Sequence, residues 1–422
     1  MNAAHRVMAV VGDMMKSSPS ASADERSTLA KRTSHSLTRL CDSLVGPLCR
    51  SRDHFLHLFG LGPWVHSSIS IAQQLDLRCE QFTFILRQAW LLQVTDTGNN
   101  ELSTNYISTQ NCIWLILNDI IIGTAVGTTL VENKAYLARL VLKLAMHLTV
   151  DSMRESISWL DNWPAGLKLN TELSRFFFLI FNALLEFWSV VLIYISYALP
   201  TIIELIGISG VLGMTMILAC TSDLVSLLTA HLFMAYTVVR VAFRTQLLTT
   251  NSLYNLFRGK RYNVLRRRLD SWYYDLDQLL LGAMLFTLSS FLFPTVLVYY
   301  VLFALTRLAL QSLQAGLKVA LALLNHFPLF ALTLRIKDPW RLPGGVTLRP
   351  REDRQGFIIK NSPIALSKIF DQYFVLGSRL ASHYNPMRLI IAFVKGNRLD
   401  SIPHKLIRYT YRTQGPQLHM HN

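Results

Sequence analysis

Residues 256–305 read LFRGKRYNVLRRRLDSWYYDLDQLLLGAMLFTLSSFLFPTVLVYYVLFAL, and this stretch decides the fold class of the chain. A basic run and an acidic patch are followed by 27 residues without a formal charge, 279–305. At about 1.5 Å per residue, a helix of this length exceeds the roughly 30 Å hydrocarbon core of a bilayer. The stretch therefore predicts a membrane-spanning helix with a basic loop at one end.

The composition of the whole chain also indicates a membrane protein. Of its 422 residues, 51% are hydrophobic and only 16% are charged, and the mean hydropathy is +0.31. The formal net charge is nevertheless +15. The basic residues lie between and after apolar runs, where they set the orientation of a membrane protein, and they do not form a separate basic module. We therefore expect contact with membrane lipid and no nucleic-acid partner.

Four apolar runs are long enough to cross a bilayer once each. They are 176–198, 201–221, 279–305 and 309–334. Pro200 is expected to separate the first two as a hairpin, and the chain is expected to reverse between the last two. The predicted fold is an all-α, polytopic helical membrane protein with about four spans, within a range of four to six, plus amphipathic interfacial helices.

Two further segments leave the number of spans open. The run 113–131 contains Asp119 near its centre, and an unpaired aspartate there costs on the order of 3 kcal/mol. This run is either a span or a buried or re-entrant helix. The segment 222–244 carries polar residues every three or four positions, which favours an interfacial or re-entrant helix over a full span.

The pattern divides the chain into four regions. Residues 1–50 form a basic, Ser-rich arm that is expected to be disordered, and 51–172 form a cytosolic or interfacial helical region. The membrane domain is 173–334. The tail, 335–422, has 15 Lys or Arg against 5 Asp or Glu, and Asn361-Ser362-Pro363 is expected to begin an amphipathic helix in it. Both the tail and the basic loop should lie in the cytosol.

Four ordered motifs, LFRGKRYNVLRRRLDS, DQLLLGAMLFT, FPTVLVYY and NHFPLFAL, resemble the signature of the PIG-Q family, subunit Q of phosphatidylinositol N-acetylglucosaminyltransferase. The resemblance is best over about 250–345. It implies a non-catalytic scaffold subunit of an endoplasmic reticulum membrane complex. That complex transfers N-acetylglucosamine from UDP-N-acetylglucosamine to phosphatidylinositol, the first step of glycosylphosphatidylinositol anchor synthesis. The implied partners are subunits of the PIG-A, PIG-C and PIG-H types, and PIG-A is the glycosyltransferase.

The resemblance and the charge pattern single out two sets of residues. Six basic residues are candidates for contact with partner subunits or with anionic lipid such as phosphatidylinositol: Arg258, Lys260, Arg261, Arg266, Arg267 and Arg268. The family-motif positions are Phe257, Gly259, Tyr262, Asn263, Asp270, Asp277, Gln278, Pro294, Asn325, His326 and Pro328. No catalytic residue, metal ligand or cofactor is assigned.

Two other function classes stay open. Asp275-Leu276-Asp277 matches the DxD pattern by which many nucleotide-sugar enzymes hold a divalent metal, so the chain could itself be a membrane glycosyltransferase acting on a lipid. The structural alternative is that these aspartates complement the dipole of the helix that follows. A transporter is the third hypothesis, because Glu186, Lys318 and His326 are polar residues in apolar runs.

Overall fold

The computed structural model describes residues 69–94, 99–162, 166–263, 265–339, 343–350, 357–383 and 386–398. The expected arm, 1–50, lies outside them. The helices of the first half are α4 (Ser70–Val94), α5 (Asn99–Glu132), α6 (Lys134–Ala145), the π-helical η1 (Met146–Asp151), α7 (Ser152–Asp161), α8 (Thr171–Ile208) and the 3-10 turn η3 (Ser209–Leu212). The remaining elements are α9 (Met214–Leu228), α10 (Ala230–Phe257), β1 (Lys260–Asn263), β2 (Arg268–Ser271), α11 (Leu276–His326), α12 (Leu329–Lys337), β3 (Pro343–Pro350), β4 (Phe357–Pro363), α13 (Leu366–Ile369), α14 (Asp371–His383) and α15 (Pro386–Val394).

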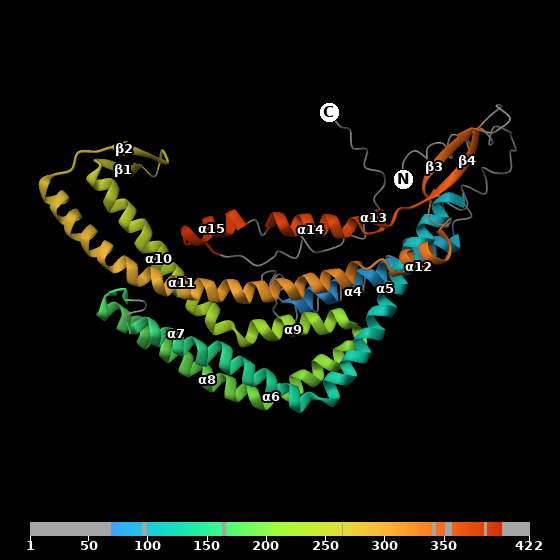
Figure 1. Cartoon of the computed structure of the whole chain (residues 1–422), viewed down its shortest axis with the longest axis horizontal. Helices are drawn as coiled ribbons and strands as arrows, with labels where there is room; N and C mark the ends of the chain where they lie inside the picture. Colours follow the sequence, from blue (N-terminus) through green and yellow to red (C-terminus); the bar gives the residue numbers. More distant parts are fainter. Residues whose placement is uncertain are drawn as a thin grey trace.

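Long apolar helices form the body of the molecule, and the two antiparallel hairpins, β1–β2 and β3–β4, lie at its ends (Figure 1). Within the described residues, three helical stretches are long and apolar enough to cross a membrane: Thr109–Glu132, Thr171–Leu212 and Leu276–His326. A fourth candidate is the pair α9 and α10, which is bent by 54° at its break. The predicted all-α, polytopic fold class is confirmed.

The structure differs from the expected helix boundaries in two places. The helix α8 continues through Pro200, so the expected hairpin turn is absent; proline keeps a helical φ and removes only one backbone donor, which membrane helices tolerate. The helix α11 runs without a break for 51 residues, so the chain does not reverse between 305 and 309. Arg307, which lies in this interval, is a good helix former, and its guanidinium lies over the ring of Phe233 of α10, 4.8 Å from the centroid.

Two other expectations about local structure are corrected or refined. Asn361–Pro363 lie at the end of strand β4, and the first helix after them begins only at Leu366. The segment 222–244 is not one helix, since it is interrupted at Thr229 between α9 and α10. The hydroxyl groups of Ser226, Thr229 and Thr237 bond to carbonyls four residues earlier, as Thr237 Oγ1 does to Phe233 O at 2.8 Å. Which segments cross a bilayer stays a prediction.

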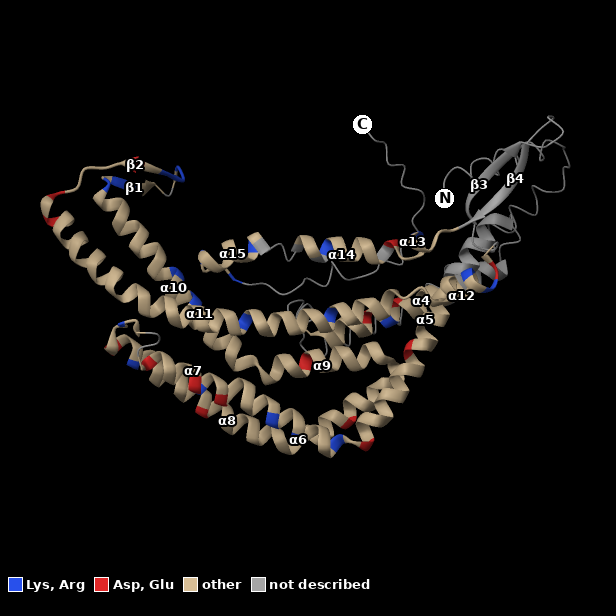
Figure 2. Cartoon of the chain, viewed as in Figure 1, with Lys and Arg blue, Asp and Glu red and all other residues tan. Residues whose placement is uncertain are grey.

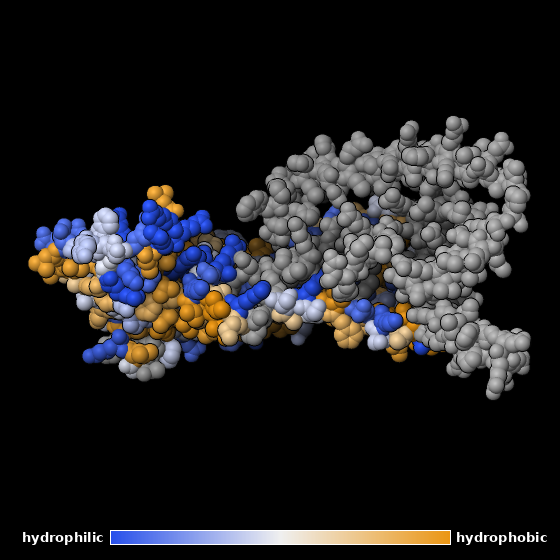
Figure 3. All heavy atoms as spheres, turned by 90° about the horizontal axis from the view of Figure 1, so that it is seen from above, coloured by the Kyte–Doolittle hydropathy of each residue, from blue (hydrophilic) through white to orange (hydrophobic). Residues whose placement is uncertain are grey.

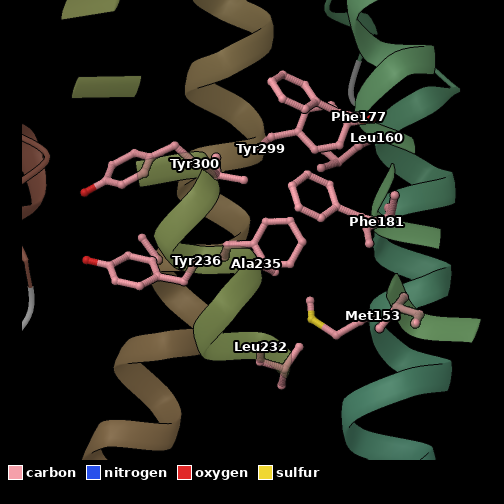
Figure 4. Close-up of a cluster of buried hydrophobic side chains, with 14 of the residues drawn as sticks. Met153, Leu160, Phe177, Phe181, Leu232, Ala235, Tyr236, Tyr299 and Tyr300 are labelled. Atoms are coloured by element: carbon pink, nitrogen blue, oxygen red, sulfur yellow. The ribbon is translucent and has the colours of Figure 1, made fainter. Parts of the chain in front are cut away.

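Aromatic residues dominate the core between α7, α8, α10 and α11. Figure 4 shows Phe177 and Phe181 of α8 facing Tyr299 of α11, with Tyr236 and Ala235 of α10 beside them. The rings of Phe181 and Phe303 lie 4.6 Å apart between centroids. Such pairs add about 0.5–1.5 kcal/mol each beyond the burial of their area. This core fixes α10 and α11 side by side.

The C-terminal helices α14 and α15 lie along α11 (Figure 1). Tyr300 points its hydroxyl away from the aromatic core (Figure 4) and donates to Phe393 O at 2.8 Å. The Tyr373 hydroxyl on α14 donates to Leu323 O of α11, also at 2.8 Å. The two hydrogen bonds attach α14 and α15 to α11.

Candidate functional site

Asp119, the residue that left the assignment of 113–131 as a span open, is buried and has partners for both of its carboxylate oxygens. It lies on α5 with 3% exposure, and its carboxylate forms an ion pair with the Arg78 guanidinium of α4. The same carboxylate accepts hydrogen bonds from the amide of Thr215 at 3.1 Å and from its hydroxyl at 2.7 Å. A buried charge is tolerated when it is paired and its remaining lone pairs are satisfied. The segment 113–131 therefore belongs to a helix whose acidic residue has its partner within the chain.

Further polar side chains extend this pair into a network that we call the polar node. Its members come from four helices: Gln74, Arg78 and Gln81 of α4, Asp119 of α5, Thr215 of α9 and Asn325 of α11. Arg78 donates to Thr215 Oγ1 and to Gln81 Oε1, both at 2.8 Å. Gln74 and Asn325 exchange two amide hydrogen bonds, of 3.2 and 3.0 Å. The polar node joins α4, α5, α9 and α11.

Asp223 provides a second connection between α4 and α9. Its two carboxylate oxygens each accept a backbone amide of the first turn of α4, from Ser70 and Ile71, at 2.9 Å. These amides have no partner within a helix, and a negative charge is favourable at a helix N-terminus. Asp223 therefore fixes the start of α4 against α9, on the same two helices that the polar node connects.

Glycines allow the backbones beside the polar node to approach closely. Gly213, between η3 and α9, has φ of +123°, and a Cβ there would meet the carboxylate of Asp119. Gly123 and Gly127 form a GxxxG pair on α5. A Cβ on either would meet backbone of the chain at Gly207 or Gly210. Small residues four apart are typical of close packing between membrane helices.

The second candidate site is the basic hairpin, which we define as Arg258–Ser271 with strands β1 and β2. Lys260 pairs with Ser271, Arg261 with Asp270, Tyr262 with Leu269, and Asn263 with Arg268. Paired residues share a face, so Tyr262 and Leu269 lie on one face, together with Lys260, and Arg261, Arg268 and Asp270 lie on the other. Figure 2 shows Lys and Arg gathered at this hairpin, and of the six predicted basic residues only Lys260 is partly buried.

Family-motif residues shape the basic hairpin. Gly259 has φ of +61°, and its carbonyl accepts from the Trp272 amide at 2.8 Å, which closes the open end of the hairpin. At the other end, Asn263 Oδ1 accepts the amides of Leu265 and Arg266, and its Nδ2 donates to Asp270 at 2.9 Å. Phe257 packs edge-on against Phe286 of α11, with 5.4 Å between ring centroids.

The carboxyl of Asp270 has a pKa below its ordinary value of 3.8. The hydrogen bond from Asn263 is the main cause, and the hydrogen bond and charge of Arg268, at 2.7 Å, add to it. The basic side chains themselves make few such bonds. Arg258 lies over the ring of Tyr254 and Arg261 over that of Trp272. These stacked guanidinium groups remain exposed, so they are available to an anionic ligand.

The structure separates the other predicted residues instead of forming one site from them. Asp275 and Asp277 are exposed at the start of α11, and Gln278 and Pro294 are exposed farther along it. Asn325 belongs to the polar node. His326 does not, because its Nδ1 bonds to Ala322 O of the same helix at 2.6 Å. Pro328 directly precedes α12.

The residues that suggested a transporter are also apart from one another. Glu186 on α8 accepts a hydrogen bond from Asn182 of the same helix at 2.9 Å. Lys318 is partly buried on α11.

Sequence reasoning did not identify Gln74, Arg78 or Thr215. The indication in the sequence that such partners exist was Asp119, because a carboxylate in an apolar run requires a partner. Choosing Arg78 among the chain's 41 basic residues required the fold. Within the described part of the chain, no group of three or more His, Cys, Asp or Glu is placed to hold a metal ion.

Comparison with known proteins shows similarity along most of the chain. The model of the family described as N-acetylglucosaminyl transferase component (Gpi1) matches residues 72–344. An N-acetylglucosaminyl-phosphatidylinositol biosynthetic protein of Schizosaccharomyces pombe is 36% identical over 79% of this chain and 53% of its own length. Phosphatidylinositol N-acetylglucosaminyltransferase subunits are also similar: GPI1 of Saccharomyces cerevisiae is 30% identical over 81% of this chain and 61% of its own length, and subunit Q of Mus musculus is 31% identical over 82% and 59%.

The chain thus spans between about half and three fifths of the length of these relatives. No solved structure matches it.

Proposed function

This chain belongs to the family of N-acetylglucosaminyl transferase components (Gpi1), and from this membership we propose that it is a membrane scaffold subunit without catalytic activity of its own. The complex that it supports would transfer N-acetylglucosamine from UDP-N-acetylglucosamine to phosphatidylinositol. The proposal follows from the relatives, which are named as a biosynthetic protein for N-acetylglucosaminyl-phosphatidylinositol and as subunits of the transferase.

The observation that carries the scaffold role is the use of the polar groups in the polar node. Arg78 and Asp119 bond to each other and to Thr215 in the interior, so neither side chain is accessible to a substrate. The node holds four helices in one arrangement, as a scaffold requires. By contrast, the DxD aspartates are exposed at the start of α11, where negative charge complements the helix dipole.

The partners and the location follow from the same proposal. Subunits of the PIG-A, PIG-C and PIG-H types would bind the chain in the endoplasmic reticulum membrane, and the PIG-A type would supply catalysis. The basic hairpin and the basic tail would lie in the cytosol, because an excess of Lys and Arg marks cytosolic loops.

A pair of substitutions distinguishes the scaffold from a glycosyltransferase. Asp275→Asn with Asp277→Asn removes both candidate metal ligands while it keeps their size. We expect N-acetylglucosamine transfer per assembled complex to stay within about twofold of wild type, because dipole complementation stabilises the helix by only about 0.3–1 kcal/mol for each exposed carboxylate and takes no part in the transfer step. The matched control is Glu172→Asn, which removes a first-turn carboxylate from α8.

Loss of turnover in the double variant, with assembly and the control intact, would assign catalysis to this chain. Transfer is measured with radiolabelled UDP-N-acetylglucosamine, and assembly by the yield of co-purified subunits.

A further inference from the structure

An open groove lies between α10 and α11 beside the basic hairpin. Its volume is about 340 Å³, and its lining is mostly apolar: Leu247, Thr250, Asn251 and Tyr254 of α10, and Phe286, Ser290 and Phe293 of α11. The α10 residues recur at i, i+3, i+4 and i+7, and those of α11 at i, i+4 and i+7. Each set therefore lies on one face of its helix, and the groove follows the two helices lengthwise.

Basic residues lie next to one end of this groove, although none of them lines it. The guanidinium of Arg258 lies 5.8 Å from the ring centroid of Tyr254, a lining residue, and Lys260 and Arg261 follow at once in β1. Hydrophilic residues gather at the hairpin end of the molecule, with hydrophobic surface directly beside them (Figure 3). The basic hairpin is thus placed to bind an anion at the end of the apolar groove.

Exposed aromatic residues accompany the positive charge. Tyr262 is 55% exposed, Trp272 50% and Tyr273 100%. Tyr and Trp are enriched at the headgroup level of membranes, where one end of the ring is apolar and the other is hydrated. Basic residues near a membrane surface attract anionic lipid by about 1 kcal/mol each. Both features are typical of segments that lie at the level of lipid headgroups.

We infer that the groove and the basic hairpin together bind one anionic glycerophospholipid. An acyl chain lies between α10 and α11, and the phosphate lies at Arg258 and Lys260. A free phosphate would leave the apolar groove unused, and a zwitterionic lipid would leave the cationic end uncompensated. The inference deepens the proposed function and rests on it only for the position of the basic hairpin at the membrane surface.

The test is native mass spectrometry of the chain in mild detergent with phosphatidylinositol, phosphatidylserine or phosphatidylcholine. We expect the two anionic lipids to be retained about tenfold better than phosphatidylcholine, since several basic residues contribute. Equal retention of the anionic lipids would show recognition of charge, and preference for phosphatidylinositol would show additional recognition of its headgroup. Equal retention of all three lipids would overturn the inference.

Two matched pairs of variants locate the lipid. Ser290→Trp fills the groove and should lower retention of every lipid, whereas Thr287→Trp, an exposed hydroxyl residue of α11 outside the lining, should not. Arg258→Gln with Lys260→Gln should lower retention of the anionic lipids alone by about tenfold, and Arg139→Gln with Lys143→Gln on α6 should leave it unchanged. If a variant and its control change lipid retention equally, in either pair, the proposed lipid site is wrong.

A second measurement does not depend on substitution. A phosphatidylinositol carrying a photoreactive acyl chain should label peptides that contain 247–254 and 286–293. Labelling confined to other segments would overturn the proposed position of the chain. Neither measurement uses sugar transfer, so a negative result would leave the scaffold proposal standing, and a failure of the scaffold proposal would leave lipid binding measurable.

Discussion

The polar node and the basic hairpin both contain an Arg–Asp pair, but their surroundings are opposite. The side chains of Arg78 and Asp119 are 6% and 3% exposed, whereas those of Arg268 and Asp270 are 62% and 31% exposed. Water screens the second pair, so it contributes little beyond local shape. The first pair has no solvent to replace a lost partner, so the packing of four helices depends on it. The buried pair therefore contributes to helix packing, whereas the exposed charges stay accessible, as the proposed lipid site requires.

The largest effect is expected from breaking the buried pair. Asp119→Asn leaves the Arg78 guanidinium buried without its counter-charge, and such a change costs about 3–5 kcal/mol. We expect a marked fall in the melting temperature of the detergent-solubilised chain, or loss of monodisperse protein. The matched control is Asp270→Asn in the basic hairpin, which should leave the melting temperature almost unchanged.

A double substitution distinguishes the cost of an unpaired buried charge from the cost of losing the ion pair itself. Arg78→Met with Asp119→Leu removes both charges together, and we expect it to recover most of the stability that Asp119→Asn loses, because apolar residues of similar volume often replace a buried pair. If Asp119→Asn and Asp270→Asn lower the melting temperature equally, the contrast between the two regions is wrong.

An intermediate effect is expected from the glycine that lies against the polar node. Gly213→Ala places a methyl group against the carboxylate of Asp119 and keeps a φ of +123° that alanine disfavours. The strain should cost at least about 1–3 kcal/mol. Gly316→Ala on α11 is the control: its Cβ meets nothing within 4 Å, so it should stabilise the chain by about 0.5–1 kcal/mol. A lower melting temperature for Gly213→Ala and a higher one for Gly316→Ala would confirm this prediction. A similar decrease in both variants would contradict it.

The sequence predicted the helical membrane class and a basic loop at 258–268, because both depend on local runs of apolar or basic residues, but it did not predict that this loop forms a β-hairpin. It failed at Pro200, where α8 continues because membrane helices tolerate a proline, and between 305 and 309, where α11 continues through the expected reversal. It also failed at the polar node, because Arg78 and Thr215 are 137 residues apart and nothing local links them.

The smallest effect concerns pH and the basic hairpin. The pKa of Asp270 is depressed in the folded chain, so its contribution to hairpin order is complete above the unfolded pKa, near 3.8, and is lost as pH falls through the lower folded value. Amide hydrogen exchange of residues 260–271, corrected for its intrinsic pH dependence, should be constant above pH 5 and rise below 3.8.

Asp270→Asn should remove that pH dependence while exchange in α11 stays unchanged. A rise that persists in Asp270→Asn would mean that another group controls the order of the basic hairpin.

The most direct test of the scaffold role is a comparison of N-acetylglucosamine transfer to phosphatidylinositol by two preparations of the tagged chain. One is the assembly co-purified in mild detergent, and the other is the chain stripped of its partners and still folded by its melting transition. We expect transfer by the assembly and none above background by the stripped chain. Transfer by the stripped chain alone would contradict the account and would identify Asp275 and Asp277 as candidate catalytic residues.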